Sequence, residues 1–166
     1  MLIGFSGVNR VFYQFLHARL TMAVVNKSVL VGHSAQQMFE LVDGVEHYRE
    51  FLPWCGGTEV KLRDGLTTIA TIHIDYMHIK QHFTTENLNQ PPHLIKMKLL
   101  DGPFKKLDGE WHFKALTEDA CKIEFMLNYE FSNKLLDTVL GPVFSYIANS
   151  FVESFIQRAE QIYGAS

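Results

Sequence analysis

Histidines are the residues of this sequence best suited to chemistry, and five of them fall in one stretch of alternating polar and apolar residues. Imidazole nitrogens bind transition metals or move protons near neutral pH. The alternation places His73, His82 and His112 on the solvent side of their strands, with His78 and His93 near turns. A metal site needs several ligands that converge, usually oriented by further hydrogen bonds. We therefore interpret these residues as separate solvent-facing histidines and predict no metal site.

The cysteines offer neither a disulfide framework nor a cysteine-based zinc site, because there are only two and they are far apart. Cys121 falls on the apolar side of an alternating strand, where we expect an unreactive packed thiol. Cys55 follows Trp54 in a loop. Free thiols of this kind fit a reducing cytoplasm. No glycine-rich phosphate-binding motif occurs in the sequence.

The carboxylates of the strand region lie on the side of the sheet that we expect to face water. A general acid or base must instead reach a substrate held in a pocket. The inward polar groups are nearly limited to Gln81, Thr85 and the hydroxyls of Tyr76 and Tyr129. Such a face suits non-enzymatic binding of an apolar molecule with a few hydrogen bonds to its polar head. The outward acids are Asp75, Glu86, Asp108, Glu110, Glu124 and Glu130.

The elements that position these residues begin with a short strand, Ala23–Val31, rich in β-branched residues. A helix follows from Ser34, which forms a capping-box pattern with Gln37, and the helix ends at Gly44. We expect a second short helix over residues 45–52. The two helices form a small insert after the first strand.

Period-two alternation then continues through about six more strands. The Asp64-Gly65 dipeptide predicts a hairpin turn between residues 58–63 and 66–77. Alternation this regular is typical of an antiparallel sheet with one dry and one wet face.

The last element is a helix capped by Ser132 that runs to about Tyr163, with a wide apolar stripe. Its length would be about 45 Å at the rise of an α-helix. Gly141-Pro142 predicts a kink, or a break into a short helix and a long one. A twisted sheet of about seven strands must curl around this single helix, which predicts an α+β fold.

The space between sheet and helix is either plain hydrophobic core or a partly unfilled pocket, and periodicity leaves both open. Its predicted inward residues on the sheet include Phe83, Met97, Trp111, Phe113 and Phe125, and those on the helix include Phe144, Ile147 and Phe151.

Outward lysines could form a basic band, but acids are interleaved with them, so we favour an ordinary solvated face. Lys105-Lys106, beside a Gly-Pro-Phe turn, is a more focused candidate for contact with an anionic lipid or RNA. The lysines of the band are Lys80, Lys96, Lys98, Lys114 and Lys122.

The overall numbers describe one ordinary domain: 166 residues, 47% of them hydrophobic, with a formal net charge of −3. They exclude a disordered chain and a protein that coats nucleic acid through charge alone, and we expect no DNA partner. No uninterrupted apolar run approaches the roughly 18 residues of a membrane span, so a soluble or peripheral protein is expected.

Residues 1–21 carry arginines and aromatics but no acid, so a targeting peptide or membrane-surface helix has to be considered. Serine is scarce, and no charged segment precedes a long apolar stretch. We favour a loosely attached extension, with the working domain covering residues 22–166.

Four segments together resemble one family, the coenzyme-Q-binding START-domain proteins. They are residues 48–55 (YREFLPWC), 83–85 (FTT), 101–113 (DGPFKKLDGEWHF) and 131–144 (FSNKLLDTVLGPVF). The family includes the bacterial ribosome-association toxins and the mitochondrial ubiquinone chaperone, within a polyketide cyclase-like superfamily. The resemblance extends from Met22 nearly to the C-terminus, and its two longest segments are specific.

The resemblance implies a helix-grip fold of the START and Bet v 1 type, with a hydrophobic cavity for ubiquinone or a similar polyprenyl lipid and no required cofactor. By position, residues 51–55 would lie near the cavity mouth, and Trp111 and Phe113 would line its wall. Relatives are often labelled cyclase or dehydrase, but an enzymatic role does not fit an inner face without an acid–base pair. The expected ligand-binding residues are Phe51, Leu52, Pro53, Trp54, Ile72, Ile74, Tyr76, Phe83, Met97, Trp111, Phe113, Phe125, Leu127, Phe144, Ile147 and Phe151.

Two functions of different classes remain open. The protein could bind ubiquinone and support respiratory electron transport as a quinone chaperone. Alternatively, it could bind the large ribosomal subunit and block subunit joining, in which case Lys105 and Lys106 are the candidate contacts. We expect a cytoplasmic protein, with peripheral contact at the inner face of the membrane allowed.

Overall fold

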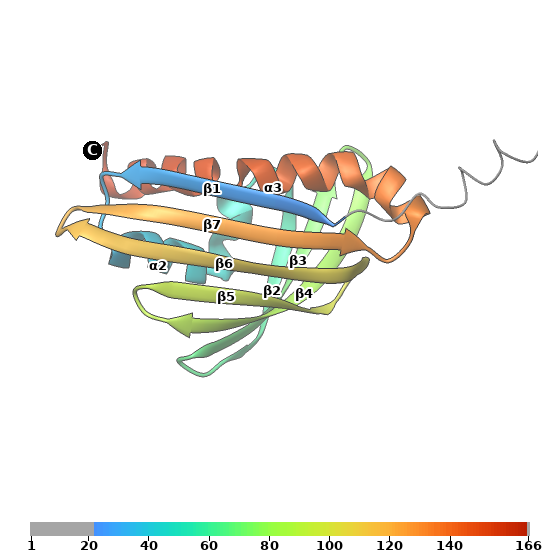
Figure 1. Cartoon of the computed structure of the whole chain (residues 1–166), viewed down its shortest axis with the longest axis horizontal. Coiled ribbons are helices and arrows are strands. Elements are labelled where there is room, and N and C mark those ends of the chain that lie inside the picture. The colour runs from blue at the N-terminus through green and yellow to red at the C-terminus, as the bar shows by residue number, and fades with distance from the viewer. Residues whose placement is uncertain (1–21, 166) are drawn as a thin grey trace, which may run out of the picture.

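Antiparallel pairing joins seven strands into one sheet, in the spatial order β1-β7-β6-β5-β4-β3-β2 (Figure 1). The structure, a computed structural model, describes residues 22–165, so the predicted extension over residues 1–21 lies outside the described residues. The elements are β1 (Ala23–Val31), α2 (Ala35–Asp43), the 3₁₀ helix η1 (Val45–Glu50), β2 (Cys55–Arg63), β3 (Thr67–Tyr76), β4 (Ile79–Gln90), β5 (Leu94–Asp101), β6 (Phe104–Thr117), β7 (Ala120–Phe131) and α3 (Lys134–Tyr163).

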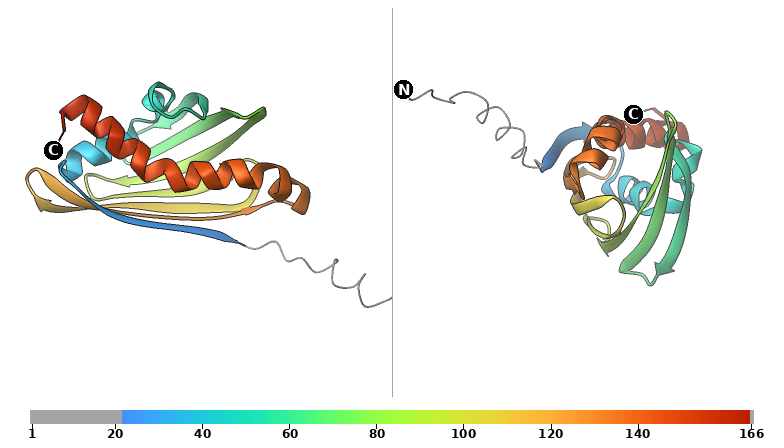
Figure 2. Two further views of the ribbon diagram at one scale, coloured as in Figure 1. Left: turned by 90° about the horizontal axis from the view of Figure 1, so that it is seen from above. Right: turned by 90° about the vertical axis from the view of Figure 1, so that its right-hand side faces the viewer.

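The sheet curves around α3, as Figure 2 shows, so the expected α+β helix-grip architecture is confirmed. Burial explains the arrangement, because the apolar stripe of α3 faces the concave side of the sheet. The buried residues of the helix are Leu140, Phe144, Ile147, Ala148, Val152, Phe155 and Ala159.

Local signals predicted several element ends correctly. The Ser34 hydroxyl accepts from the Gln37 amide at 3.1 Å, and the Ser34 amide donates to the Gln37 side chain at 2.9 Å, which completes the capping box. Gly44 ends α2, as expected. At the β2–β3 hairpin Gly65 has a φ of +81°, a conformation that glycine adopts without strain.

The N-cap of α3 differs from the prediction: it is Asn133 and not Ser132. The Asn133 side chain accepts from the Leu136 amide at 3.0 Å. The Ser132 amide instead donates to the Pro103 carbonyl at 3.0 Å, which holds Ser132 outside the helix.

The predicted alternative of a break at Gly141-Pro142 is wrong, since α3 is one helix with Pro142 inside it. Leu140 and Phe144 are both buried. Their packing holds the segments on either side of Pro142 against the sheet, and this outweighs the backbone hydrogen bond that proline removes.

Hydropathy shows one helix in the described part of the chain, α3, that is long and apolar enough to cross a membrane by length and composition. The expectation that no segment could span a membrane was based on uninterrupted apolar runs, and polar residues interrupt the apolar stretch of α3. In this fold α3 is the helix that the sheet wraps.

The predicted dry and wet faces are confirmed along most of the sheet, and β7 alternates between buried and more exposed residues along its length. Thr71 and Thr84 depart from the pattern, since both lie on the outer face yet are buried. Their hydroxyls are 2.7 Å apart. They are directly paired across β3 and β4, and their cross-strand neighbours Glu59 and Asp101 are longer, which encloses the two short side chains.

Candidate functional site

A small cavity lies between the concave face of the sheet and α3. Its volume is about 40 Å³, roughly the space of one water molecule. The space between sheet and helix is therefore mostly packed core with a small unfilled remainder. The lining residues are Val45, Tyr48, Ala70, Ile72, Phe83, Thr85, Asn87, Met97, Leu107, Phe125, Leu127, Phe144, Ile147, Ala148 and Phe151.

Many of the residues expected to bind a ligand do line this cavity. Those on the sheet are Ile72, Phe83, Met97, Phe125 and Leu127. Those on α3 are Phe144, Ile147 and Phe151, spaced so that they share one face of the helix. Their role in binding stays a prediction, but the structure brings them together around one space.

Trp111 and Phe113 do not line the cavity, contrary to the expectation from the resemblance. Both are at most 1% exposed. The Trp111 ring packs 4.4 Å from that of Phe125, and the Phe113 ring lies 5.8 Å from that of Phe39. Phe39 of α2 packs on Phe113 and Phe155 of α3 packs on Trp111, so these inward residues meet side chains instead of open space.

The loop expected at the cavity mouth lies behind the cavity wall. Trp54 is fully buried, and its ring stacks 5.3 Å from that of Phe151, a residue that lines the cavity. Phe51 packs against Phe155 and under the guanidinium of Arg158. Leu52 and Cys55 are buried and Pro53 is exposed, and none of residues 51–55 lines the cavity.

Two further expected residues lie on the α3 side of β3 but outside the cavity. Ile74 lines a separate small pocket near Phe104 and Leu140. Tyr76 stacks on Tyr146 of α3, with ring centroids 5.5 Å apart.

Asn87 is a cavity residue that the sequence analysis missed. It is 6% exposed, and its carboxamide oxygen accepts from the Thr85 hydroxyl at 2.9 Å. The NH₂ group of Asn87 has no hydrogen-bond partner among the described residues, so it can serve as a donor in a mostly apolar space. The sequence signal was available, because the period-two alternation that places Gln81, Phe83 and Thr85 on the inner face also places Asn87 there.

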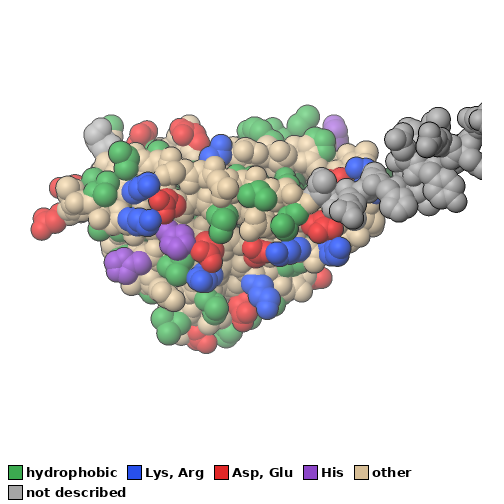
Figure 3. All heavy atoms as spheres, in the orientation of Figure 1, with side chains coloured by type: hydrophobic (Ala, Val, Ile, Leu, Met, Phe, Trp, Pro, Cys, Tyr) green, Lys and Arg blue, Asp and Glu red, His purple; other side chains and the backbone are tan. Residues whose placement is uncertain are grey.

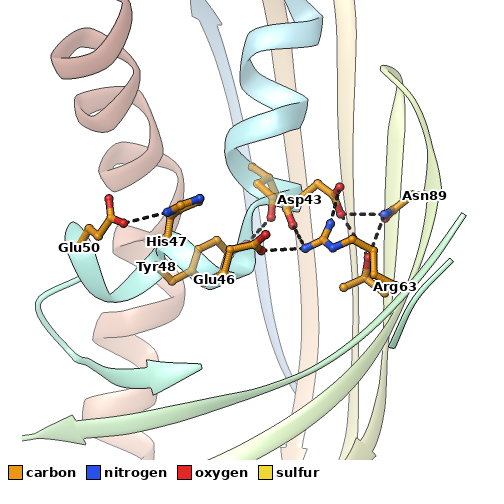
Figure 4. A network of polar contacts seen from close by, with 9 residues as sticks. Asp43, Glu46, His47, Tyr48, Glu50, Arg63 and Asn89 are labelled. Carbon is orange, nitrogen blue, oxygen red and sulfur yellow. Dashed lines mark hydrogen bonds and ion pairs between the residues drawn. The ribbon is translucent and has the colours of Figure 1, made fainter. Parts of the chain in front are cut away.

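Beside the cavity a carboxylate reaches the inner face from α2 (Figure 4). The Asp43 carboxylate accepts from Asn89 at 2.8 Å and from Arg63 at 2.9 Å, with Thr68 at 3.4 Å. Arg63 also bonds Glu46 at 2.8 Å. The expectation of no inward acid considered strands only, so it missed this residue. An arginine and two neutral donors already engage the carboxylate, so it forms a structural ion pair and not a free general base.

The other candidate reactive groups are kept protonated by burial. Burial raises the pKa of the Cys121 thiol to about 11 and also raises the pKa of Cys55. Burial likewise raises the pKa of the Tyr48 hydroxyl, which donates to the Val42 carbonyl at 2.5 Å. A protonated thiol is a poor nucleophile, so these groups act as packing and hydrogen-bonding elements.

The histidines of the outer face each lie beside an acid. His73 is 3.1 Å from Glu59, and His112 is 2.9 Å from Glu110. Within residues 22–165 no group of three or more metal-ligating side chains could hold a metal ion.

The outer lysines are interleaved with acids, as Figure 3 shows. Lys105 lies 3.2 Å from Glu130, and Lys106 lies 3.3 Å from Asp108. Hydrogen bonds from Lys114 and Lys122 lower the pKa of Glu124 to about 2. The face is therefore a mixed solvated surface and not a continuous basic band.

Comparison with known proteins finds a match to one family model. Residues 31–156 match the family described as polyketide cyclase/dehydrase and lipid transport. The match runs from the end of β1 into α3, so it covers the sheet, the helical insert and the cavity.

Two curated relatives are named for different functions, one for ribosome association and one for coenzyme Q binding. The chain is 39% identical to the ribosome association toxin RatA of Escherichia coli K12, over 93% of this chain and 98% of the relative. It is 28% identical to the mitochondrial coenzyme Q-binding protein COQ10 of Drosophila melanogaster, over 96% of this chain and 67% of the relative. Among solved structures, the Zhui aromatase/cyclase from a Streptomyces species superposes with a TM-score of 0.71 at 16% identity, over 88% of this chain and all of the other, which supports the fold alone.

Proposed function

Because the chain belongs to the polyketide cyclase/dehydrase and lipid-transport family, we propose that it binds ubiquinone or a similar polyprenyl lipid without catalysing a reaction. The observation that carries the proposal is the cavity, which is lined by aromatic and aliphatic side chains and holds a single amide donor, Asn87. This combination suits a ligand with a large apolar part and a carbonyl-bearing head. The name of COQ10, a relative similar over almost the whole chain, supports the same ligand class.

The cavity has to expand to hold such a ligand. Ligand pockets are usually about 300–1,000 Å³, whereas this one is about 40 Å³. Met97 is half-buried at its edge, and methionine is flexible enough to move aside. The proposal therefore requires side chains around the cavity to move when the ligand binds.

A non-enzymatic role fits the chemistry of the groups around the cavity. Asp43 is held by Arg63, and the Tyr48 hydroxyl is held by the Val42 carbonyl. Both cysteines are buried with raised pKa values. We place the protein in the cytoplasm, in contact with the inner face of the membrane when lipid is exchanged.

Fluorescence titration with a short-chain ubiquinone tests the proposal. Trp54 and Trp111 are the two tryptophans of the chain, and both have their rings within 6.3 Å of that of the cavity residue Phe151. A quinone in the cavity should therefore quench their emission in a saturable way. Quenching that rises linearly without saturation would contradict specific binding.

Association with the large ribosomal subunit is a second candidate, favoured by the 39% identity to RatA over nearly the full length of both chains. Overexpression should then raise free subunits in a sucrose gradient at the expense of joined ribosomes. The double variant Lys105→Glu/Lys106→Glu should lose this effect, while Lys114→Glu/Lys122→Glu on the same face should keep it. An unchanged profile with the unaltered protein would count against this function.

A further inference from the structure

The hairpin formed by β5 and β6 is open at its turn end (Figure 1). Only residues 102 and 103 connect the strands, yet their pairing stops at Lys98 and Asp108. Beyond that point β5 stays paired with β4, and β6 stays paired with β7. The sheet therefore parts between residues 99–101 and residues 104–107.

Gly102 explains why the β5–β6 turn lies close to β4. A Cβ at this position would lie 2.8 Å from the Cβ of Phe83 on β4, so only glycine allows so close an approach. The turn is drawn toward β4, and the end of β5 moves with it, away from β6.

A groove of about 470 Å³ lies over this opening. It is on the face of the sheet seen in Figure 3, where charged and apolar side chains alternate. Its apolar lining consists of Leu88, Met97, Leu99, Leu107 and Met126, and its charged residues are Lys96, Lys98, Lys105, Lys106, Glu86, Asp108 and Glu110.

Met97 and Leu107 line both this groove and the internal cavity. The two spaces are thus separated by these two side chains. Met97 reaches over Gly109, where a Cβ would lie 2.7 Å from the Met97 methyl group. An unbranched methionine packed over a glycine can swing aside without moving the backbone.

We propose that this gap is the entrance through which the lipid passes between the groove and the cavity. The inference rests on the proposed lipid binding and adds the route to it. The apolar lining matches a polyprenyl chain, and the lysine ammonium groups can donate to the carbonyl oxygens of a quinone head.

Entry at this place leaves the backbone hydrogen bonds of the sheet intact. An opening between any other two strands of the described sheet would break the backbone hydrogen bonds that pair them. Each broken hydrogen bond has a net cost of about 1 kcal/mol. Between residues 99–101 and 104–107 no such pairs exist, so only Met97 and Leu107 have to move.

The test blocks the groove with a covalent label. Met126 lines the groove but not the cavity, and it is 40% exposed. Met126→Cys is modified with a bulky maleimide, and Leu62→Cys on β2, from a residue 43% exposed, is the matched control. Both native cysteines are buried. Rates of uptake and release of a short-chain ubiquinone are then followed by stopped-flow tryptophan fluorescence.

The label at position 126 should slow both uptake and release at least tenfold and leave the Kd unchanged, because an entrance controls the barrier and not the end states. The labelled control should behave like unlabelled protein. Equal rates for the two labelled proteins would overturn the entrance, and so would a weaker affinity without slower uptake. Failure of the unlabelled protein to bind quinone at all would instead refute the proposed function, and the entrance with it.

Discussion

The double variant Thr85→Val/Asn87→Leu should bind a short-chain ubiquinone about tenfold more weakly than the unaltered protein. Asn87 supplies the amide donor of the cavity, and its oxygen is held by Thr85. Losing one hydrogen bond to the ligand costs about 1.4 kcal/mol, which is tenfold in affinity. Replacing both partners together leaves neither buried group unpaired, so the free energy of unfolding should change little.

A second pair of buried, hydrogen-bonded side chains provides the control. Thr71 on β3 and Thr84 on β4 are hydrogen-bonded to each other next to the Thr85–Asn87 pair, but they face away from the cavity. The variant Thr71→Val/Thr84→Val should therefore keep the affinity of the unaltered protein. Equal affinities for the two double variants would mean that the Asn87 amide does not touch the ligand.

Phe155→Ala should produce the largest loss of stability. The ring is fully buried, and its centroid lies within 5.9 Å of those of Tyr48, Phe51, Trp111 and Phe151. Truncating a buried phenylalanine costs about 3–5 kcal/mol, a large part of the roughly 5–15 kcal/mol that stabilises a typical domain. Denaturant unfolding measures the change.

Leu135→Ala on the same helix is the matched control, because Leu135 is 73% exposed. It should change the free energy of unfolding by no more than about 0.5 kcal/mol. If Phe155→Ala costs no more than this control, the contact between α3, η1 and the sheet does not hold the fold together as described.

The faces of the strands could be predicted because side-chain direction alternates with every residue. This alone places Ile72, Phe83 and Phe125 on the inner face. It does not say how deep each inward residue lies or what covers it. Trp111 and Phe113 are inward as predicted, but α2 and Phe155 occupy the space in front of them.

The polar parts of the site were harder to predict because they depend on contacts between distant residues. Asp43 and Asn89 are 46 positions apart in sequence and meet only in the folded chain. Asn87 lies in a strand, where asparagine is uncommon, so composition argued against an inward position. The open end of the β5–β6 hairpin depends on register and on the contact of Gly102 with Phe83, neither of which follows from periodicity.

The most direct test of lipid binding is organic extraction of the purified protein followed by mass spectrometry of the extract. The account predicts a quinone or another polyprenyl lipid in the extract, at much higher yield than from the same amount of the Thr85→Val/Asn87→Leu variant. An extract without such a lipid, from protein that was also exposed to ubiquinone before purification, would contradict lipid binding.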